Sequence, residues 1–286
     1  MKILVTGGCG YVGSTLIPLL LSEGHHVISI DTKWFGDYLP KHKNLNNLKL
    51  DIRDTKLIPM DKVDVVIHLA NIANDPAVEL NPTLSWEINV LSSLQLIDKA
   101  VRNNVKKFIF ASSGSVYGVK EEPKVTEDLP LVPISVYNKT KMVAERVFLS
   151  YANKIKIHNI RPATVCGYSP RMRLDVSVNM LTFQALKNKK INVFGGKQIR
   201  PNIHIKDMVN VYKFFVDNQL ESGNYNAGFE NISILQIAKL VQNVIPSEII
   251  ITQSNDPRSY RQDSTKLLNL GFKPKFGVRD AIEEIK

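Results

Sequence analysis

Residues 2–13, KILVTGGCGYVG, decide the fold class of this chain. The continuous apolar stretch 2–6 predicts a buried strand, and a helix follows it directly. Between the two stand Gly7, Gly10 and Gly13. Glycine permits a tight turn and lets the backbone approach a pyrophosphate, to which the helix N-terminus offers N–H groups and positive dipole. The stretch therefore predicts the first unit of a dinucleotide-binding sheet.

The rest of the first half alternates apolar strands with helices, which is typical of a parallel sheet covered on both faces. Strands are predicted at 26–31, 63–70, 106–113 and 154–162, and helices at 82–104 and 135–152. We predict an α/β protein with a doubly wound parallel sheet (a Rossmann fold) and a smaller C-terminal substrate-binding subdomain. The predicted division is 1–165 for the cofactor-binding domain and 166–286 mainly for the substrate subdomain, with about 191–221 returning to the Rossmann sheet.

Composition narrows the class of protein. The 286 residues are 44% hydrophobic and 22% charged, as in ordinary soluble globular proteins. Two cysteines and no visible secretion signal predict a cytoplasmic location. The net charge of +10 comes from dispersed residues, so we expect a Lys-rich solvated surface and neither a nucleic-acid nor a membrane partner. No His, Cys or Asp cluster has metal-ligand spacing, so no metal is expected.

An acidic residue, Asp31, ends the second strand. Its carboxylate can accept hydrogen bonds from both hydroxyls of an adenosine ribose and would repel a 2′-phosphate, so we predict NAD rather than NADP. Lys33 nearby would favour NADP instead, because its ammonium attracts a 2′-phosphate. Asp51 and Ile52, in the stretch LDIRD (50–54), either bracket the adenine or belong to a simple loop.

A tyrosine and a lysine, Tyr137 and Lys141, lie one helical turn apart in VYNKTK. Alone, this spacing is also ordinary helix surface. At the carboxyl edge of the sheet, however, the ammonium and a positive nicotinamide ring would favour the phenolate of a tyrosine whose free pKa is about 10. The phenolate can then take a proton from a sugar hydroxyl as hydride leaves the same carbon.

Three serines, Ser112, Ser113 and Ser115, follow the preceding strand in FASSGSVYG and reach the same edge. We choose Ser113 to hydrogen-bond the substrate oxygen, although spacing alone does not separate it from its neighbours.

The chain resembles the extended short-chain dehydrogenase/reductase superfamily, in its NAD-dependent epimerase/dehydratase group, which acts on nucleotide sugars. The matching segments are TGGCGYVG, Asp31, HLA (68–70), Asn89, SSGSVYG, YNKTK, RPATVCG (161–167), RPNIHIKD (200–207) and DSTKLLNLGFKP (263–274). The resemblance implies that Ser113, Tyr137 and Lys141 are catalytic. The predicted cofactor contacts are Gly7, Gly10, Tyr11, Val12, Gly13, Asp31, Asp51, Ile52, Leu69, Ala70, Asn89, Tyr137 and Lys141.

One departure from the resembled group is informative. Members that dehydrate sugars carry Asp-Glu after the catalytic Ser or Thr, and decarboxylating members also need an acid there. This sequence has Gly114-Ser115, and neither residue can do general acid–base work. The 4,6-dehydratase and decarboxylase activities are therefore disfavoured.

A nucleotide sugar also brings a diphosphate, which the bidentate guanidinium of arginine suits. The resemblance implies that Arg200 and an arginine of the last motif bind the diphosphate, and that Asn179 and Phe194 hold the base. SPRMRLD (169–175), together with DPRSYRQD (256–263), also resembles GDP-heptose C4 dehydrogenases. The predicted substrate contacts are Asn74, Asn179, Phe194, Arg171, Arg173, Arg200, Arg258 and Arg261.

The leading functional prediction is an NAD-dependent nucleotide-sugar epimerase that oxidises sugar C4 and then reduces it again. The alternative is a nucleotide-sugar C4 dehydrogenase or ketoreductase with the same first half-reaction. A non-catalytic NAD-bound scaffold is a third class, against which the intact serine, tyrosine and lysine argue. The resemblance further implies a homodimer formed through the helices at 82–104 and 135–152.

Overall fold

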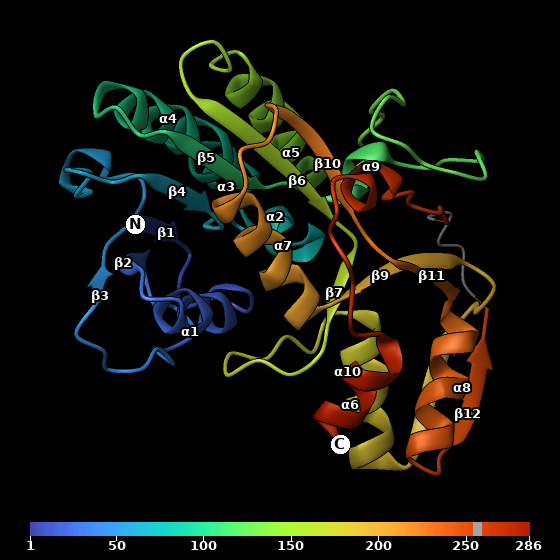
Figure 1. Cartoon of the computed structure of the whole chain (residues 1–286). Coiled ribbons are helices and arrows are strands. Elements are labelled where there is room, and N and C mark those ends of the chain that lie inside the picture. Colours follow the sequence, from blue (N-terminus) through green and yellow to red (C-terminus); the bar gives the residue numbers. More distant parts are fainter. Residues whose placement is uncertain (254–258) are drawn as a thin grey trace.

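The computed structural model describes residues 1–253 and 259–286, and its centre is a seven-stranded sheet (Figure 1). The strand order is β10-β6-β5-β4-β1-β2-β3, and every pairing is parallel, which confirms the predicted doubly wound class. The strands are β1 (Lys2–Thr6), β2 (His26–Asp31), β3 (Leu45–Lys49), β4 (Val65–His68), β5 (Lys107–Ala111), β6 (Lys156–Pro162) and β10 (Gly223–Ala227).

Helices cover both faces of this sheet. One face carries α1 (Gly13–Ser22) and α7 (Ile205–Asp217), and the other carries α4 (Ser92–Arg102) and α5 (Val136–Leu149). Successive side chains of a strand point to opposite faces. In β1, Ile3 and Val5 therefore join the core under α1 and α7, whereas Leu4 joins the core under α4 and α5. Both faces are buried, which is why the strands are continuously apolar.

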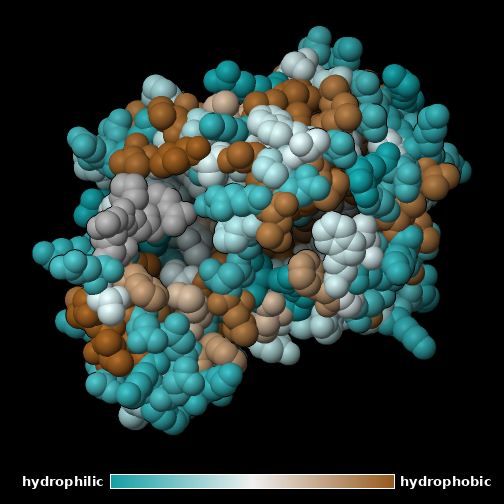
Figure 2. Space-filling model, turned by 180° about the vertical axis from the view of Figure 1, so that it is seen from behind, coloured by the Kyte–Doolittle hydropathy of each residue, from teal (hydrophilic) through white to brown (hydrophobic). Residues whose placement is uncertain are grey.

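A smaller lobe is built around two short sheets (Figure 1, lower right). One contains β7 (Thr164–Cys166), β9 (Ile199–His204) and β11 (Glu230–Ser233), and the other pairs β8 (Lys190–Phe194) with β12 (Glu248–Thr252). The helices α6 (Ser177–Asn188), α8 (Ile234–Val244) and α10 (Val278–Ile285) share a separate apolar core there. Figure 2 shows the surface hollowed between this lobe and the main body.

Two sequence predictions differ from the structure. The segment 191–204 stays in the smaller lobe, and it is α7 and β10 that return to the large sheet. The predicted helix 82–104 is interrupted: α3 (Pro82–Trp86) leads into a π-helical turn, η2 (Glu87–Leu91), before α4 begins. Shorter elements are α2 (Asp75–Leu80), η1 (Thr55–Leu57), η3 (Gly114–Tyr117) and α9 (Thr265–Asn269).

Ser92 closes the π-helical turn with two hydrogen bonds. The Glu87 carbonyl accepts from the Ser92 backbone N–H, five residues on, and also from the Ser92 hydroxyl at 2.9 Å. The turn contains Asn89, whose side chain is buried beside the start of α5.

No helix in the described ranges is long and apolar enough to cross a bilayer.

A buried lysine ties the large sheet to α7. Lys107, at the start of β5, donates from Nζ to the carbonyls of Phe215, Val216 and Asn218 at 2.5, 2.9 and 2.8 Å. These carbonyls belong to the last turn of α7, where a cation also complements the helix dipole. Burial lowers the pKa of Lys107, so its hydrogen bonds compensate a real desolvation cost.

Lys107→Met should therefore lower the free energy of unfolding by about 2 kcal/mol, because buried carbonyls lose their donor. Urea denaturation followed by circular dichroism measures the loss. The matched control is Lys106→Met, since the neighbouring side chain is 80% exposed and its ion pair with Asp64 should contribute less than about 1 kcal/mol. Equal losses in the two variants would contradict this role for Lys107.

Candidate active site

The glycine loop forms the tight turn that the sequence predicts between β1 and α1. Gly7 has a φ of 73°, and a Cβ there would lie 2.7 Å from the Ala70 nitrogen. A Cβ on Gly13 would lie 2.4 Å from the Gly7 carbonyl oxygen. Both positions require glycine, because the end of β4 and the start of α1 approach the loop too closely for a side chain. The N-terminus of α1 therefore opens directly at the carboxyl edge of the sheet.

Asp31 is fixed beside this loop. Its two carboxylate oxygens accept hydrogen bonds from the backbone N–H of Cys9, at 3.0 Å, and of Lys33, at 2.6 Å. The Lys33 ammonium turns to Asp37, which it contacts at 2.7 Å. The charge of Lys33, which would favour a 2′-phosphate, is thus neutralised by Asp37. The Asp31 carboxylate, which suits a ribose diol, lies beside the glycine loop as predicted.

The remaining predicted cofactor contacts lie around the same edge. The Asp51 carboxylate is held by Arg53 at 2.8 Å, and Ile52 is buried in the core under α4 and α5. The Ala70 N–H donates to the Thr6 hydroxyl at 3.3 Å, which fixes the turn after β4. Leu69 is anchored in the same way, through its N–H to the Thr6 carbonyl at 3.1 Å.

Asn89 has its side chain engaged within the protein. Its Oδ1 accepts from the Ile72 N–H at 2.8 Å, and its Nδ2 donates to the Thr140 hydroxyl at 3.1 Å. Asn89 thus joins the loop after β4 to the helix α5. A direct contact of Asn89 with the cofactor stays a prediction.

The structure brings Ser113, Tyr137 and Lys141 together at the end of β5. Ser135 caps α5 by accepting from the Asn138 N–H at 3.2 Å, and this places Tyr137 in the first turn. Lys141 Nζ donates to the Ala111 carbonyl at 2.6 Å and lies 5.9 Å from the centre of the Tyr137 ring.

The three candidate serines have different partners. Ser112 is buried and donates to Glu145, and Ser115 donates to Asn138 Oδ1 at 2.6 Å. The Ser113 hydroxyl oxygen lies 2.7 Å from that of Ser115, and Ser113 also hydrogen-bonds Tyr137, which works to lower the pKa of that phenol. Of the three, Ser113 is the one beside the phenol, as chosen from the sequence.

The electrostatics differ from the expectation for Tyr137. Burial raises the pKa of Tyr137, the charge of Arg173 and the hydrogen bond from Ser113 oppose this rise, and Asp75 reinforces it. Lys141 was expected to be the cation acting on the phenol, but Arg173 takes that place in the protein alone. Burial lowers the pKa of Lys141 to about 7, against the charge of Glu145.

Arg173 belongs to a polar chain that reaches Tyr137, on whose phenol its charge acts. Its guanidinium binds the Asp175 carboxylate through Nε at 3.0 Å and Nη2 at 2.5 Å. Asn74 Nδ2 donates to the same carboxylate at 2.7 Å. Despite burial, these contacts lower the pKa of Asp175 to about 2. Sequence reasoning named Asn74 and Arg173 but missed Asp175, whose only signal was its spacing two residues after the arginine.

The loop that carries these arginines is fastened to the glycine loop. The Tyr11 hydroxyl donates to the Gly167 carbonyl at 2.7 Å, and the Ser169 hydroxyl donates to the Tyr11 carbonyl at 2.7 Å. Asn179 is fully buried and completes the junction: its Nδ2 donates to the Tyr11 hydroxyl at 3.1 Å, and its Oδ1 accepts from the Gly167 N–H at 2.9 Å. Tyr11 and Asn179 therefore hold the two loops together, whereas we predicted a cofactor contact and a nucleotide-base contact.

The other predicted substrate residues are more scattered. The Arg171 guanidinium lies 4.0 Å from the centre of the Phe35 ring, over the loop after β2 and on the cofactor side. Arg200 is half-buried in β9, Arg261 is exposed, and Phe194 is 56% exposed at the end of β8. Arg258 lies outside the described residues. Val12 is half-buried and packs against the core beside α1.

The glycine that follows Ser113 is closely surrounded by side chains of the last segment. A Cβ on Gly114 would lie 2.9 Å from the Tyr260 hydroxyl oxygen and 3.0 Å from Gln262 Oε1. An acidic side chain at this position would have to displace both. The absence of the acid noted in the sequence is thus matched by the packing around it.

The fold and site define an NAD-dependent enzyme of the short-chain dehydrogenase/reductase type. The chain belongs to the NAD dependent epimerase/dehydratase family, whose model matches residues 3–228. It is 29% identical to a UDP-glucose 4-epimerase of Lactobacillus helveticus, over 96% of this chain and 92% of that protein. It is 26% identical to UDP-glucuronic acid decarboxylase 1 of Xenopus tropicalis, over 99% of this chain and 70% of that protein.

A solved structure agrees with the sequence comparisons. The UDP-glucuronic acid 4-epimerase of Bacillus cereus, in complex with UDP-glucuronic acid and NAD, superposes with a TM-score of 0.87 at 27% identity. The superposition covers 99% of this chain and 97% of that chain. The predicted fold, family and NAD dependence are therefore confirmed.

The cofactor side predicts selectivity for NAD. Wild-type protein should bind NAD at least about tenfold more tightly than NADP, since Asp31 repels the 2′-phosphate. Asp31→Ala should reduce this preference, and Asp37→Ala should strengthen NADP binding by releasing the Lys33 ammonium. Titration of protein fluorescence with each dinucleotide measures both affinities. Equal affinities in the wild type would show that Asp31 does not face the ribose.

Proposed function

We propose that this protein is an NAD-dependent nucleotide-sugar 4-epimerase. The observation that carries the proposal is the joint placement of Ser113, Tyr137 and Lys141 beside the glycine loop, at the carboxyl edge where open α/β sheets bind ligands. The UDP-sugar 4-epimerases that resemble this chain along nearly its whole length support the same reaction.

The residues divide the chemistry between them. Tyr137 takes the proton of the sugar C4 hydroxyl and returns it at the end, and Ser113 hydrogen-bonds the same oxygen. When bound, NAD supplies the acceptor and donor of hydride, and its positive ring adds to the cations that favour the phenolate. Lys141 Nζ, held by the Ala111 carbonyl, lies one turn from the phenol to stabilise its charge. Because the hydride leaves and returns to C4, the reaction has no net oxidation.

The packing at Gly114 argues for this reaction over two others in the family. Dehydration and decarboxylation need an acid in the two positions after the serine, where this chain has Gly114 and Ser115, and Tyr260 and Gln262 lie close to where a side chain on Gly114 would begin. The likeness to a decarboxylase therefore extends to the fold and cofactor but not to this position.

The substrate we favour is a UDP-sugar, by analogy with the relatives. We propose that Arg200 and Arg261 bind the diphosphate and that Phe194 stacks on the base, since its ring is exposed at the end of β8. Asn74 and Arg173 would meet the sugar, because their shared partner Asp175 places them beside Tyr137.

The function is tested by incubating the protein with UDP-glucose, UDP-glucuronic acid and GDP-sugars and following the products by NMR. We expect one of them to interconvert with its C4 epimer without accumulation of NADH. Stoichiometric NADH with a keto sugar would instead establish the C4 dehydrogenase. A 4-keto-6-deoxy product or released CO₂ would refute the argument from Gly114.

Tyr137→Phe should reduce turnover by about a thousandfold or more while leaving NAD binding intact, since it removes only the proton-transferring oxygen. Tyr151→Phe is the matched control, because that phenol contacts Asp98 just beyond the end of α5. Turnover and NAD affinity are measured for both variants. Full activity of the Tyr137 variant would rule out the mechanism.

We also propose a homodimer through α4 and α5. Leu91, just before α4, is 52% exposed, and Leu94 and Val143 are half-buried on the two helices. Light scattering should therefore report twice the 32.2 kDa chain mass, and Leu91→Arg should shift the mass towards the monomer. A monomeric wild type at working concentration would refute this proposal.

A further inference from the structure

A buried ion pair lies directly behind the catalytic residues. Glu145 follows Lys141 by one turn of α5, and its carboxylate binds Arg161 of β6 through two bonds, from Nε at 2.9 Å and from Nη2 at 2.8 Å. Both side chains are only 2% exposed. The Ser112 hydroxyl donates to the same carboxylate. A buried ion pair seldom stabilises a fold more than apolar residues of similar volume would, so its position beside the site calls for a role.

Three successive residues at the end of β5 each contact a side chain of α5, and Glu145 makes the middle contact. The Ala111 carbonyl accepts from Lys141, the Ser112 hydroxyl binds Glu145, and Ser113 lies against Tyr137. Loss of the middle contact would release the strand end that presents Ser113. The carboxylate is thus part of the geometry that brings serine and phenol together.

Lys141 is buried and needs a counter-charge. The groups that face its ammonium from β5 and from the loop after β4 are the Phe110 ring at 4.7 Å, the Ala111 carbonyl and the Asn71 amide, whose oxygen accepts at 3.2 Å in the amide orientation that its neighbours require. His68 of β4 is close enough to interact, but burial lowers its pKa to about 3, so it is neutral. On α5 itself stand Tyr137 and Glu145, and the Glu145 charge works to raise the pKa of Lys141.

We propose that Glu145 is a positioning residue for the reaction, which supplies the buried counter-charge of Lys141 and fixes Ser113 through Ser112. The proposal rests on the roles given above to Ser113, Tyr137 and Lys141. It assigns a function to a carboxylate that does not reach the reacting atoms.

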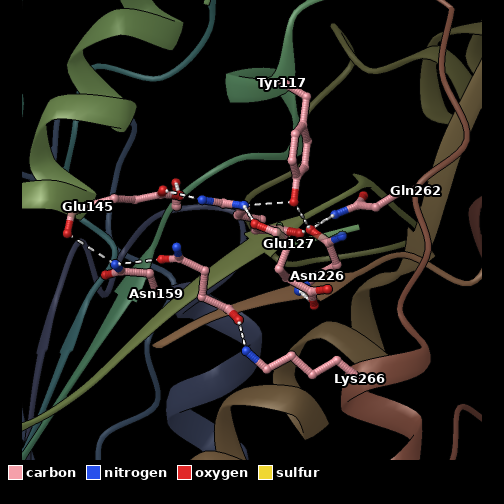
Figure 3. A network of polar contacts seen from close by, with 10 residues as sticks. Tyr117, Glu127, Glu145, Asn159, Asn226, Gln262 and Lys266 are labelled. Carbon is pink, nitrogen blue, oxygen red and sulfur yellow. Dashed lines mark hydrogen bonds and ion pairs between the residues drawn. The ribbon is translucent and has the colours of Figure 1, made fainter. Parts of the chain in front are cut away.

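The same pair connects the catalytic helix to the segment around Gly114. Arg161 Nη1 donates to the Tyr117 hydroxyl at 2.7 Å, and that hydroxyl donates to Asn226 Oδ1 at 2.8 Å. Gln262 Nε2 donates to the same Asn226 oxygen at 3.0 Å, so the network runs from Glu145 to Gln262 (Figure 3). The ion pair thereby also supports the side chain that closes the space beside Gly114.

The test separates charge from packing with a double variant. Glu145→Gln alone would leave Arg161 buried and unpaired, so Glu145→Gln is combined with Arg161→Gln. Without the carboxylate charge, the pKa of Lys141 falls, so the protonated lysine is lost at a lower pH. Because turnover needs the protonated lysine, the alkaline limb of the kcat profile should move about one pH unit towards lower pH. The sugar used is the one that turns over fastest in the screen above.

Two control variants keep the charge. Ser112→Ala retains the ion pair and should lower kcat at every pH without moving the limb. Glu221→Gln removes an exposed partner of Lys156 and should leave the profile unchanged. A folded double variant whose alkaline limb coincides with that of the wild type would overturn the proposal.

A second measurement does not require turnover. NMR of protein with ¹³C-labelled lysine, with the Lys141 signal assigned by comparison with Lys141→Met, reports its titration directly. We expect the wild-type lysine to titrate near pH 7, and loss of its proton already below about pH 5 would show that no counter-charge acts on it. An active Tyr137→Phe variant would refute the proposed function instead, since these titrations do not depend on that phenol's chemistry.

Discussion

The parallel register of the large sheet is the constraint on which the site depends. Because β1, β2, β4 and β5 run in one direction, their carboxyl ends meet at a single edge. The glycine loop, Asp31, the turn at Ala70 and the serine at 113 come from four separate strands, and they share one surface for this reason alone. Parallel strands require helical crossovers, and one of these, α5, presents the phenol and ammonium at the same edge.

The smaller lobe depends on that edge through a second set of contacts. The Tyr11 hydroxyl, next to the glycine loop, donates to the Gly167 carbonyl, and the Ser169 hydroxyl, in the loop after β7, donates to the Tyr11 carbonyl. Buried Asn179 hydrogen-bonds both the Tyr11 hydroxyl and the Gly167 N–H. The arginine-bearing loop is thus set by the glycine loop. Cofactor and substrate sides are coupled by buried hydrogen bonds, which are costly to break without replacement.

Much of the site was readable in advance, for a physical reason. Gly7 and Gly13 are dictated by local sterics, and Tyr137 and Lys141 are spaced by the helical repeat, so short stretches of sequence suffice to find them. Glu145 was missed because its partners Ser112 and Arg161 lie on other elements, and Asp175 because its bond to Asn74 joins segments far apart in the chain. The junction of Asn179 with Tyr11 was not visible in the sequence for the same reason, since it joins residues that are far apart in the chain. The contact of Asn179 with a nucleotide base stays a prediction.

The sequence by itself determined the doubly wound class, the glycine loop, the acid at the end of β2 and the helix that carries Tyr137 and Lys141, because each is encoded by local periodicity, glycine spacing or strand order. Only the tertiary structure decided which of three serines faces the phenol, where residues 191–221 divide between the lobes, and which side chains crowd Gly114. Those outcomes depend on side chains brought together from distant segments, such as Tyr260 and Gln262 against Gly114. Contacts between residues so far apart in the sequence produce no periodic pattern from which they could be predicted.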